Sequence, residues 1–174
     1  MFILVLGGSA CGKSEFAEDI CVKLGENQEK LYIATMQPFG EDAKFRIKRH
    51  QKLRASKGFD TLEKYGDLQN FSETGYHTIL LECMSTLLGN EFFSEDYSKD
   101  KISLGVEKIC ENCENLVLIS NNIFTDGIEY DSESMKYSKE LAMFNREFAK
   151  KADVVIEVCC GIPIFIKGKE VFVL

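Results

Sequence analysis

Residues 7–14 read GGSACGKS and follow directly on the short apolar run Phe2 to Leu6. This spacing matches the phosphate-binding loop GxxxxGK(S/T), and it stands where that loop is required, between a predicted strand and a predicted helix. Glycines at positions 7 and 12 let the backbone turn tightly and bring successive N–H groups close to a phosphate. The motif therefore predicts a parallel-sheet fold that binds a nucleoside triphosphate.

The residues of this loop predict separate contacts to the nucleotide. Lys13 is expected to reach the β- and γ-phosphate oxygens, and the Ser14 hydroxyl is expected to hold Mg²⁺. The helix that begins here presents its positive end to the anion. A chance glycine-rich turn is the alternative, and the match at four positions and the strand-to-helix context disfavour it. The predicted loop contacts are Gly7, Gly8, Ser9, Ala10, Cys11, Gly12, Lys13 and Ser14.

Short apolar runs alternate with helical patterns along the chain. The predicted strands are Phe2 to Leu6, Leu31 to Ala34, Thr78 to Leu81, Leu116 to Ser120 and Val154 to Val158. The predicted helices are Lys13 to Leu24, Glu41 to Lys57, Met84 to Phe93, Lys101 to Asn115 and Ser132 to Lys151. This order predicts an α/β protein with a mostly parallel sheet flanked by helices. Ile162 to Lys167 and Glu170 to Val173 flank Gly168 and predict a C-terminal β-hairpin, while 94–100 and 122–131 are the predicted loops.

Length and charge narrow the class of protein. A chain of 174 residues is expected to form one catalytic domain over residues 1–174. The net charge of −7, without a long basic run, disfavours a nucleic-acid partner. No segment has the length of a membrane span or the pattern of a secretion signal, so we expect a cytoplasmic protein.

Seven cysteines are an odd number without a secretory signal, so reduced thiols are expected. Cys110 and Cys113 form a CxxC pair, but no second pair of ligands at usable spacing completes a zinc site. The adjacent Cys159 and Cys160 lie in a strand pattern, which predicts that they fill apolar space on opposite faces.

Three of the four arginines surround one of the two histidines. Arg46, His50 and Arg54 are spaced at i, i+4 and i+8, so a helix would place them along one face, with Arg49 nearby. Guanidinium groups suit triphosphate oxygens, and an imidazole between them could bind a phosphate or attack it as a nucleophile. A solvated basic helix face is the alternative. His77, before an apolar strand, is interpreted as a structural or surface histidine.

Two carboxylates are candidates because of their positions. Glu82 closes the apolar run Thr78 to Leu81, where an acid can orient Mg²⁺ or its water, so it joins Ser14 as a predicted metal contact. Glu63 follows Thr61 between a helix and a loop, where an exposed carboxylate and a ligand contact are equally consistent with the sequence.

Several segments, in this order and spacing, resemble the bifunctional adenosylcobinamide kinase/adenosylcobinamide-phosphate guanylyltransferase family of cobalamin biosynthesis. They are LGGSACGKSEFAE at 6–18, YIATMQ at 32–37, RIKRHQKLR at 46–54, TLE at 61–63, ILLECMSTLLGN at 79–90, ISN at 119–121, FNREFAKKADVV at 144–155 and GIPIFIKG at 161–168. The resemblance spans most of the chain, and it implies a RecA-like phosphate-loop fold and a homotrimer.

The resemblance also implies a function and a set of site residues. One site would transfer a γ-phosphate from GTP or ATP to the hydroxyl of adenosylcobinamide, and then GMP from GTP to the new phosphate through a guanylylated histidine. His50 matches that histidine, with Lys13 as the second catalytic group and Arg46 and Arg49 as a phosphate clamp. The nucleotide contacts implied beyond the loop are Thr35, Met36, Gln37, Gln51, Lys52, Leu53, Arg54, Glu63 and Glu82.

Two other functions stay open at this point. A phosphate-loop kinase for another small molecule would use His50 only to bind phosphate. A GTP-dependent regulatory module would need the loop but no covalent chemistry, and the absence of an NKxD guanine-reading motif disfavours it.

Overall fold

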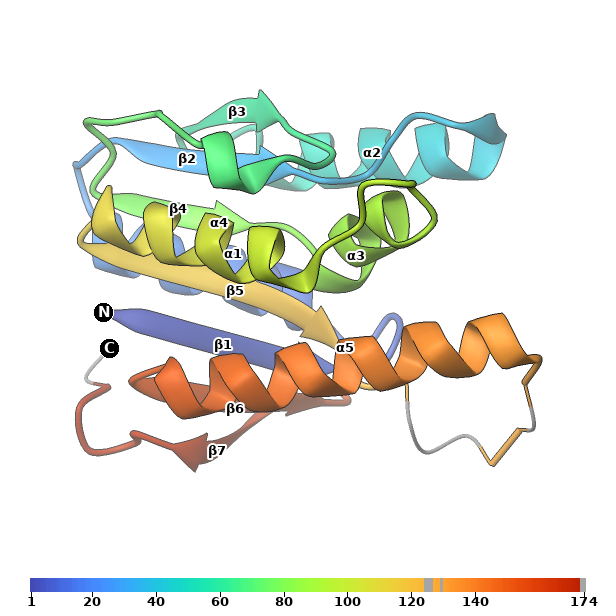
Figure 1. Cartoon of the computed structure of the whole chain (residues 1–174). Coiled ribbons are helices and arrows are strands. Elements are labelled where there is room, and N and C mark those ends of the chain that lie inside the picture. Colours follow the sequence, from blue (N-terminus) through green and yellow to red (C-terminus); the bar gives the residue numbers. More distant parts are fainter. Residues whose placement is uncertain (124–126, 129, 173–174) are drawn as a thin grey trace.

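The fold is a seven-stranded sheet with helices on both faces, in the order β3-β2-β4-β5-β1-β6-β7 (Figure 1). The computed structural model describes residues 1–123, 127–128 and 130–172, without the side chains of residues 42–44, 46, 50 and 53. All neighbouring strands are parallel except β6 and β7, which are antiparallel. The predicted α/β class and the mostly parallel sheet are confirmed.

The elements alternate along the chain as the sequence predicts. The strands are β1 (Phe2–Gly7), β2 (Lys30–Ala34), β3 (Phe59–Glu63), β4 (Thr78–Leu81), β5 (Asn115–Asn121), β6 (Val154–Cys159) and β7 (Ile162–Lys167). The helices are α1 (Lys13–Gly25), α2 (Gly40–Arg54), α3 (Met84–Phe92), α4 (Lys99–Glu111) and α5 (Ser132–Lys151), with the 3₁₀ turn η1 (Leu68–Asn70).

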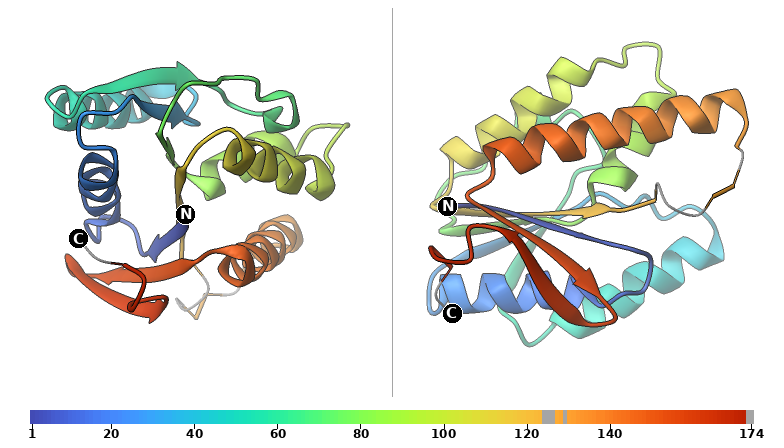
Figure 2. Two further views of the ribbon diagram at one scale, coloured as in Figure 1. Left: turned by 90° about the vertical axis from the view of Figure 1, so that its left-hand side faces the viewer. Right: turned by 90° about the horizontal axis from the view of Figure 1, so that it is seen from below.

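The sheet separates two apolar cores. Successive side chains of a strand point to opposite faces, so Leu4 of β1 belongs to the core under α3, α4 and α5, whereas Ile3 and Val5 pack against α1. Figure 2 shows the same division, with α1 and α2 on one side of the sheet and the other three helices opposite. The central strands are buried on both faces, which explains their continuous apolar runs.

One strand was not predicted from the sequence, and the predicted boundaries of two helices were wrong. Strand β3 lies at the edge of the sheet and has no buried residue, and its sequence FDTLE lacks the apolar run by which the other strands were predicted. Helix α2 ends at Arg54, three residues before the predicted Lys57. Helix α4 covers Lys99–Glu111, so it begins inside the predicted loop 94–100 and ends before β5.

The chain has a C-terminal hairpin as predicted, but β6 and β7 form it and not the two predicted strands. Strand β7 pairs with β6, and Cys159 faces Ile162 across a two-residue turn of Cys160 and Gly161, whose φ angles are 51° and 78°. Two residues with positive φ form the type I′ turn that suits a hairpin. Residues 168–172 form no strand, and Val173 lies outside the described residues. Cys159 and Cys160 are both exposed, so the prediction that they fill apolar space was also wrong.

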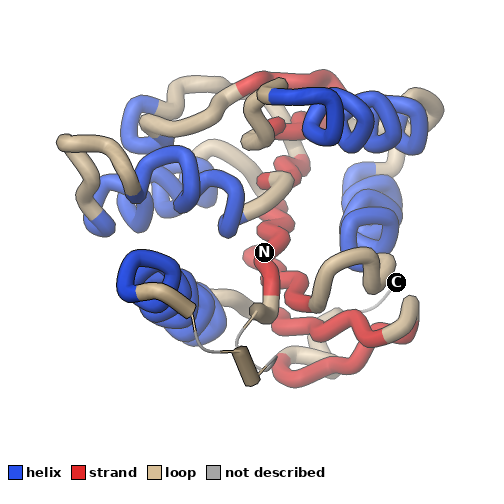
Figure 3. The backbone as a smooth tube through the Cα atoms, turned by 90° about the vertical axis from the view of Figure 1, so that its right-hand side faces the viewer, coloured by secondary structure: helices blue, strands red, loops and turns tan. Residues whose placement is uncertain are grey.

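The carboxyl ends of the parallel strands meet at one edge of the sheet, which faces the viewer in Figure 3. The phosphate-loop segment follows β1 at this edge, Met36 follows β2 and Glu82 follows β4. Parallel α/β sheets bind ligands at this edge. The fold therefore brings the predicted nucleotide-binding segments to one place.

Candidate nucleotide-binding site

The phosphate-loop segment between β1 and α1 has a conformation that depends on its glycines. A Cβ atom on Gly7 would lie 2.5 Å from Cys11 Sγ and 2.7 Å from the Val158 carbonyl oxygen. Gly12 has φ 93°, a left-handed conformation that glycine adopts without strain. Ala10 also has positive φ, at 57°. The chain thus turns sharply twice before α1 begins at Lys13.

Lys13 and Ser14 open helix α1 at the mouth of this loop. The Lys13 side chain is mostly buried, and its Nζ donates a hydrogen bond to the Gly8 carbonyl oxygen at 2.8 Å. A lysine folded back over its own loop is positioned to exchange that carbonyl for phosphate oxygens. Ser14 is half-buried beside it.

A pocket opens directly in front of the loop. It is lined by loop residues 9–14 and by Met36, Arg49, Glu82 and residues of the β4 and β5 ends. Phe45, Cys83, Thr86, Ile119 and Asn121 also line it, although the sequence analysis named none of them as a contact. Asn121 could have been predicted as a contact from the sequence, because it ends the ISN segment at the carboxyl end of a predicted strand.

Glu82 is held rigidly at the centre of the site. Its Oε2 accepts hydrogen bonds from the backbone N–H groups of Thr35 at 2.9 Å and Met36 at 3.4 Å. Burial raises the pKa of Tyr32, and a hydrogen bond between its hydroxyl and the Glu82 carboxylate raises it further. Glu82 is itself buried and reaches the loop pocket.

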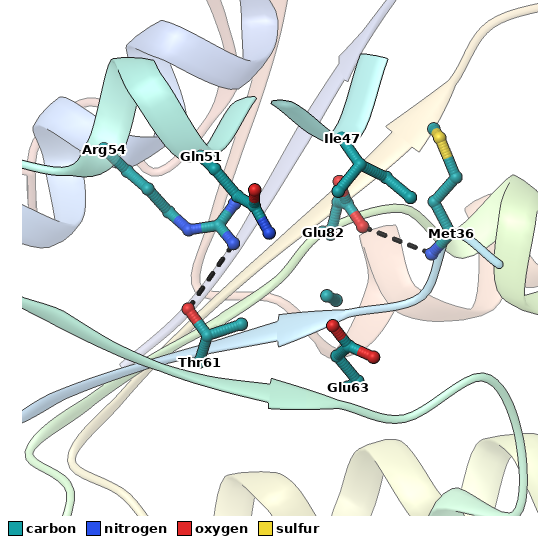
Figure 4. A pocket seen from close by; sticks show the side chains of 8 residues that line it. Met36, Ile47, Gln51, Arg54, Thr61, Glu63 and Glu82 are labelled. Carbon is teal, nitrogen blue, oxygen red and sulfur yellow. Dashed lines mark hydrogen bonds between the residues drawn. The ribbon is translucent and has the colours of Figure 1, made fainter. Parts of the chain in front are cut away.

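A second pocket lies on the other side of Glu82 and Met36, between α2 and the β2–β3 edge (Figure 4). The side chains that meet there are Ala34, Met36, Ile47, Gln51, Arg54, Thr61, Glu63 and Glu82. Met36 and Glu82 line both pockets, so the two spaces adjoin. Polar groups of opposite charge from separate elements face this second space. It is narrow, but Gln51, Arg54, Thr61 and Glu63 also line an open groove beside it, which has room for a group with hydrogen-bond donors and acceptors, such as a base.

The Arg54 side chain does not lie where the predicted phosphate-binding stripe would place it. Its guanidinium lies 3.8 Å from the centre of the Tyr32 ring, and Nη2 donates to Thr61 Oγ1 at 3.4 Å. Only 7% of the residue is exposed, which contradicts a purely solvated basic face at this position. Arg54 therefore lies in the second pocket, whereas Arg49, exposed, lines the loop pocket.

Two residues of the predicted stripe, and the implied contact Leu53, can be placed only by their backbone. Arg46, His50 and Leu53 belong to α2, and their side chains lie outside the described residues. Their helical spacing is as predicted. His50 is flanked by Arg49, which lines the loop pocket, and by Gln51, which lines the second pocket.

The other predicted contacts have varied environments. Thr35 is fully buried, and its hydroxyl donates to the Cys83 carbonyl oxygen at 3.2 Å. Gln37 is half-buried and Lys52 is exposed. The interpretation of His77 as structural agrees with its half-buried ring, whose Nδ1 lies 3.1 Å from Thr78 Oγ1.

The CxxC pair forms neither a disulfide nor a metal cluster. Cys110 and Cys113 are free and partly buried, and burial raises their pKa values to about 11 and about 12. Across the described part of the chain, no three His, Cys, Asp or Glu side chains gather as ligands for a metal ion. Within the same part, no helix is both long and apolar enough to cross a membrane.

The sequence matches one protein family over nearly its whole length. The model of the family described as cobinamide kinase / cobinamide phosphate guanyltransferase matches residues 3–166. The chain belongs to this family. The resemblance inferred from the sequence segments is thereby confirmed.

Three relatives agree with this family membership. The chain is 29% identical to the bifunctional adenosylcobalamin biosynthesis protein CobU of Escherichia coli, covering 96% of this chain and 100% of that protein. It is also 29% identical to the CobU protein of Salmonella typhimurium, with the same coverage. The CobP protein of Pseudomonas aeruginosa is 26% identical, covering 95% of this chain and 97% of the relative.

Solved structures of low sequence identity share the fold. The flagellar accessory protein FlaH of Methanocaldococcus jannaschii superposes with a TM-score of 0.51 at 12% identity, over 95% of this chain and 77% of that one. The ATPase domain of G40P gives 0.50 at 10% identity, over 90% and 68%. These likenesses support the predicted phosphate-loop fold.

Proposed function

We propose that this chain catalyses two transfers at one nucleotide site. It phosphorylates the hydroxyl of adenosylcobinamide with GTP or ATP, and it then transfers GMP from GTP to adenosylcobinamide phosphate, giving adenosylcobinamide-GDP and pyrophosphate. Residues 1–174 would act as one phosphate-loop catalytic domain, because the described strands join in a single sheet. Family membership gives the reaction, and the geometry of the site supports the roles of particular residues.

The observation that carries the proposal is the position of helix α2. This helix contributes Arg49 to the loop pocket and Gln51 to the second pocket, and His50 stands between these two residues in the sequence. A nucleotide with its β- and γ-phosphates on the loop and its base in the second pocket would place its α-phosphate near the junction of the two spaces. His50 is thus on the element that borders the reacting phosphorus.

The guanylyl transfer follows from this placement. The neutral imidazole of His50 attacks the α-phosphorus, the bond to the bridging oxygen breaks, and pyrophosphate leaves with its charge shared by Lys13, Arg49 and Arg46. An oxygen of the cobinamide phosphate then attacks the same phosphorus and displaces histidine. In the first transfer, Lys13 stabilises the γ-phosphoryl group as the acceptor hydroxyl takes it.

The donor set of the site fits Mg²⁺. Ser14 and Glu82 both line the loop pocket, and this metal usually takes one or two protein ligands together with phosphate oxygens and water. Mg²⁺ bound there would neutralise charge on the phosphates. Glu82 keeps its position through the N–H groups of Thr35 and Met36, so its second oxygen can serve the metal or its water.

The remaining nucleotide contacts are assigned from the residues that line the second pocket and from the family resemblance. We assign Gln51, Arg54 and Glu63 to the base and ribose side of GTP, with Met36 at the boundary. Thr35, Gln37, Lys52 and Leu53 belong to the same segments by family resemblance. We also propose that the chain acts as a homotrimer, since the family assembles in this way.

The test is covalent labelling with GTP that carries a radioactive α-phosphate. Wild-type protein should become labelled, and the label should be lost in acid and kept in base, as expected of a phosphoramidate. The variant His50→Asn should take up none, while the matched control His77→Asn should be labelled like wild type. An unlabelled wild-type protein that still phosphorylates adenosylcobinamide would leave only the kinase activity. Tight GTP binding without turnover on any corrinoid would instead favour a regulatory module.

A further inference from the structure

Three cysteines gather where the phosphate loop contacts the β6–β7 turn. Cys11 is in the loop, half-exposed, and lines the nucleotide pocket. Cys159 and Cys160 are exposed at the end of β6 and in the turn. A hydrogen bond with Cys160 raises the pKa of Cys159, and the charge of Cys11 is a lesser cause of the same shift.

The backbones of the two segments are in direct contact. The Gly161 N–H donates to the Cys11 carbonyl oxygen at 2.8 Å. That oxygen is two covalent bonds from the Cys11 Cα, and that nitrogen is two bonds from the Cys160 Cα. Disulfides need Cα atoms roughly 4.4–6.8 Å apart, and this hydrogen bond brings the Cys11 and Cys160 backbones to a separation of that order. The adjacent pair Cys159 and Cys160 does not suit the bond, since neighbouring Cα atoms are only about 3.8 Å apart.

The side chain of Cys11 also points toward β6. Its Sγ lies beside Gly7, where an added Cβ would be 2.5 Å from it and 2.7 Å from the Val158 carbonyl oxygen. Val158 immediately precedes Cys159 in β6. The thiol of Cys11 thus lies beside the strand that leads into the turn.

Three of the four other cysteines are buried or partly buried away from this cluster. Cys21 is fully buried, and burial raises its pKa. Burial likewise raises the pKa values of Cys110 and Cys113 to about 11 and about 12. Thiols that stay protonated and covered react slowly with oxidants, whereas exposed thiols react first. The chain therefore carries its own unreactive controls.

We propose that Cys11 and Cys160 form an oxidant-sensitive modification site, in which a hydroperoxide joins them in a disulfide that ties the phosphate loop to the β6–β7 turn. The Cys160 sulfur attacks the terminal peroxide oxygen, the O–O bond breaks, and an alcohol or water leaves. The Cys11 sulfur then attacks the sulfenic sulfur, the S–S bond forms, and water leaves. Two thiols are oxidised by two electrons and one hydroperoxide is reduced. Thiol–disulfide exchange with a dithiol restores both thiols.

The disulfide would weaken nucleotide binding. The Cys11 sulfur must leave its place beside Gly7 to reach Cys160, and the bond then fixes the Cys11 side chain to the turn and constrains the loop that carries it. The loop binds phosphate through closely positioned N–H groups, so a small displacement costs affinity. We expect at least a tenfold weaker GTP affinity, about 1.4 kcal/mol, in the oxidised protein.

The test begins with the covalent change and needs no corrinoid. Full-length protein is treated with one equivalent of hydrogen peroxide and digested with trypsin without reduction. The expected product joins peptide 1–13, which holds Cys11, to peptide 152–167, which holds Cys159 and Cys160. Fragmentation should place the bond at Cys160. A bond to Cys159, a bond between two chains, or unmodified peptides would overturn the proposal.

The second measurement is GTP affinity, before oxidation, after oxidation and after dithiothreitol. Wild type should lose affinity at least tenfold and recover it. Cys160→Asn should bind GTP equally in all three states, and asparagine suits the left-handed backbone there, with φ 51°. Cys160→Ser is a second variant with the same expectation, and Cys159→Ser should remain sensitive. Oxidised wild type with unchanged affinity would refute the coupling to the loop. Because the labelling of His50 is measured separately in reduced protein, failure here is distinguishable from failure of the proposed function.

Discussion

Replacing Glu82 with glutamine separates two roles that the structure gives to one carboxylate. The side chain anchors the chain after β2 through the Thr35 and Met36 N–H groups, and it also lines the loop pocket. Glutamine keeps the size and one acceptor oxygen, but it removes the charge. Anchoring should therefore weaken moderately, whereas support of a metal should fail.

The size of the anchoring effect is set by the two backbone bonds, and the Tyr32 hydroxyl adds a third bond to the same carboxylate. A neutral hydrogen bond contributes about 1 kcal/mol, and one to a charged group contributes roughly twice that. Loss of charge thus costs about 1 kcal/mol for the 2.9 Å bond to Thr35 and less for the 3.4 Å bond to Met36. Glu82→Gln should lower the free energy of unfolding by about 1–2 kcal/mol, or the melting temperature by roughly 2–8 °C.

The catalytic effect should be larger. We expect kcat for both transfers to fall about a hundredfold, or about 2.7 kcal/mol, with a greater requirement for Mg²⁺. Urea unfolding measures the first effect, and separate assays of phosphorylation and guanylylation measure the second. Glu91→Gln is the matched control. The Glu91 carboxylate also accepts a backbone hydrogen bond, from the Asp67 N–H at 2.7 Å, but Glu91 is not among the residues that line the loop pocket. A Glu82→Gln protein that is less stable but keeps kcat within threefold would show that the carboxylate only anchors.

Four further changes test other parts of the structure. Lys13→Ala should abolish both transfers without unfolding the chain, and retained kinase turnover would contradict a shared site. Gly105→Ala should lower the free energy of unfolding by about 1–2 kcal/mol, because a Cβ there overlaps Leu68 Cβ and lies 2.6 Å from the Leu68 carbonyl carbon; this strain outweighs the gain of about 1 kcal/mol in helix propensity. Asp131→Ala should lower the melting temperature at pH 7 by removing acceptors for the Glu133 and Ser134 N–H groups. Those bonds lower the pKa of Asp131, so the stabilisation is present above the unfolded-state pKa and should disappear as the pH falls through the folded value. Cys113→Ser should reduce the loss of stability above about pH 9: the unfolded thiol ionises there while the folded thiol, with pKa about 12, stays protonated, so stability falls as pH rises.

The parts of the site that local sequence could predict are those whose chemistry is contained in a short segment. The phosphate loop is one, because glycine spacing, Lys13 and the following helix lie within eight residues. Glu82 is another, since it directly follows a buried apolar strand. The same reasoning missed β3, because an edge strand with one face in water carries no apolar run.

The sequence by itself determined the α/β order, the phosphate loop and the family, because periodic burial and a fixed motif leave their pattern in neighbouring residues. Only the tertiary structure decided that Arg54 stacks on Tyr32, that Glu82 anchors the chain after β2, and that the turn at Cys160 contacts the loop at Cys11. The last of these joins residues that are far apart in the chain. Such pairings depend on which strands become neighbours in the sheet, and strand order is set by packing of the whole core, which no local pattern encodes.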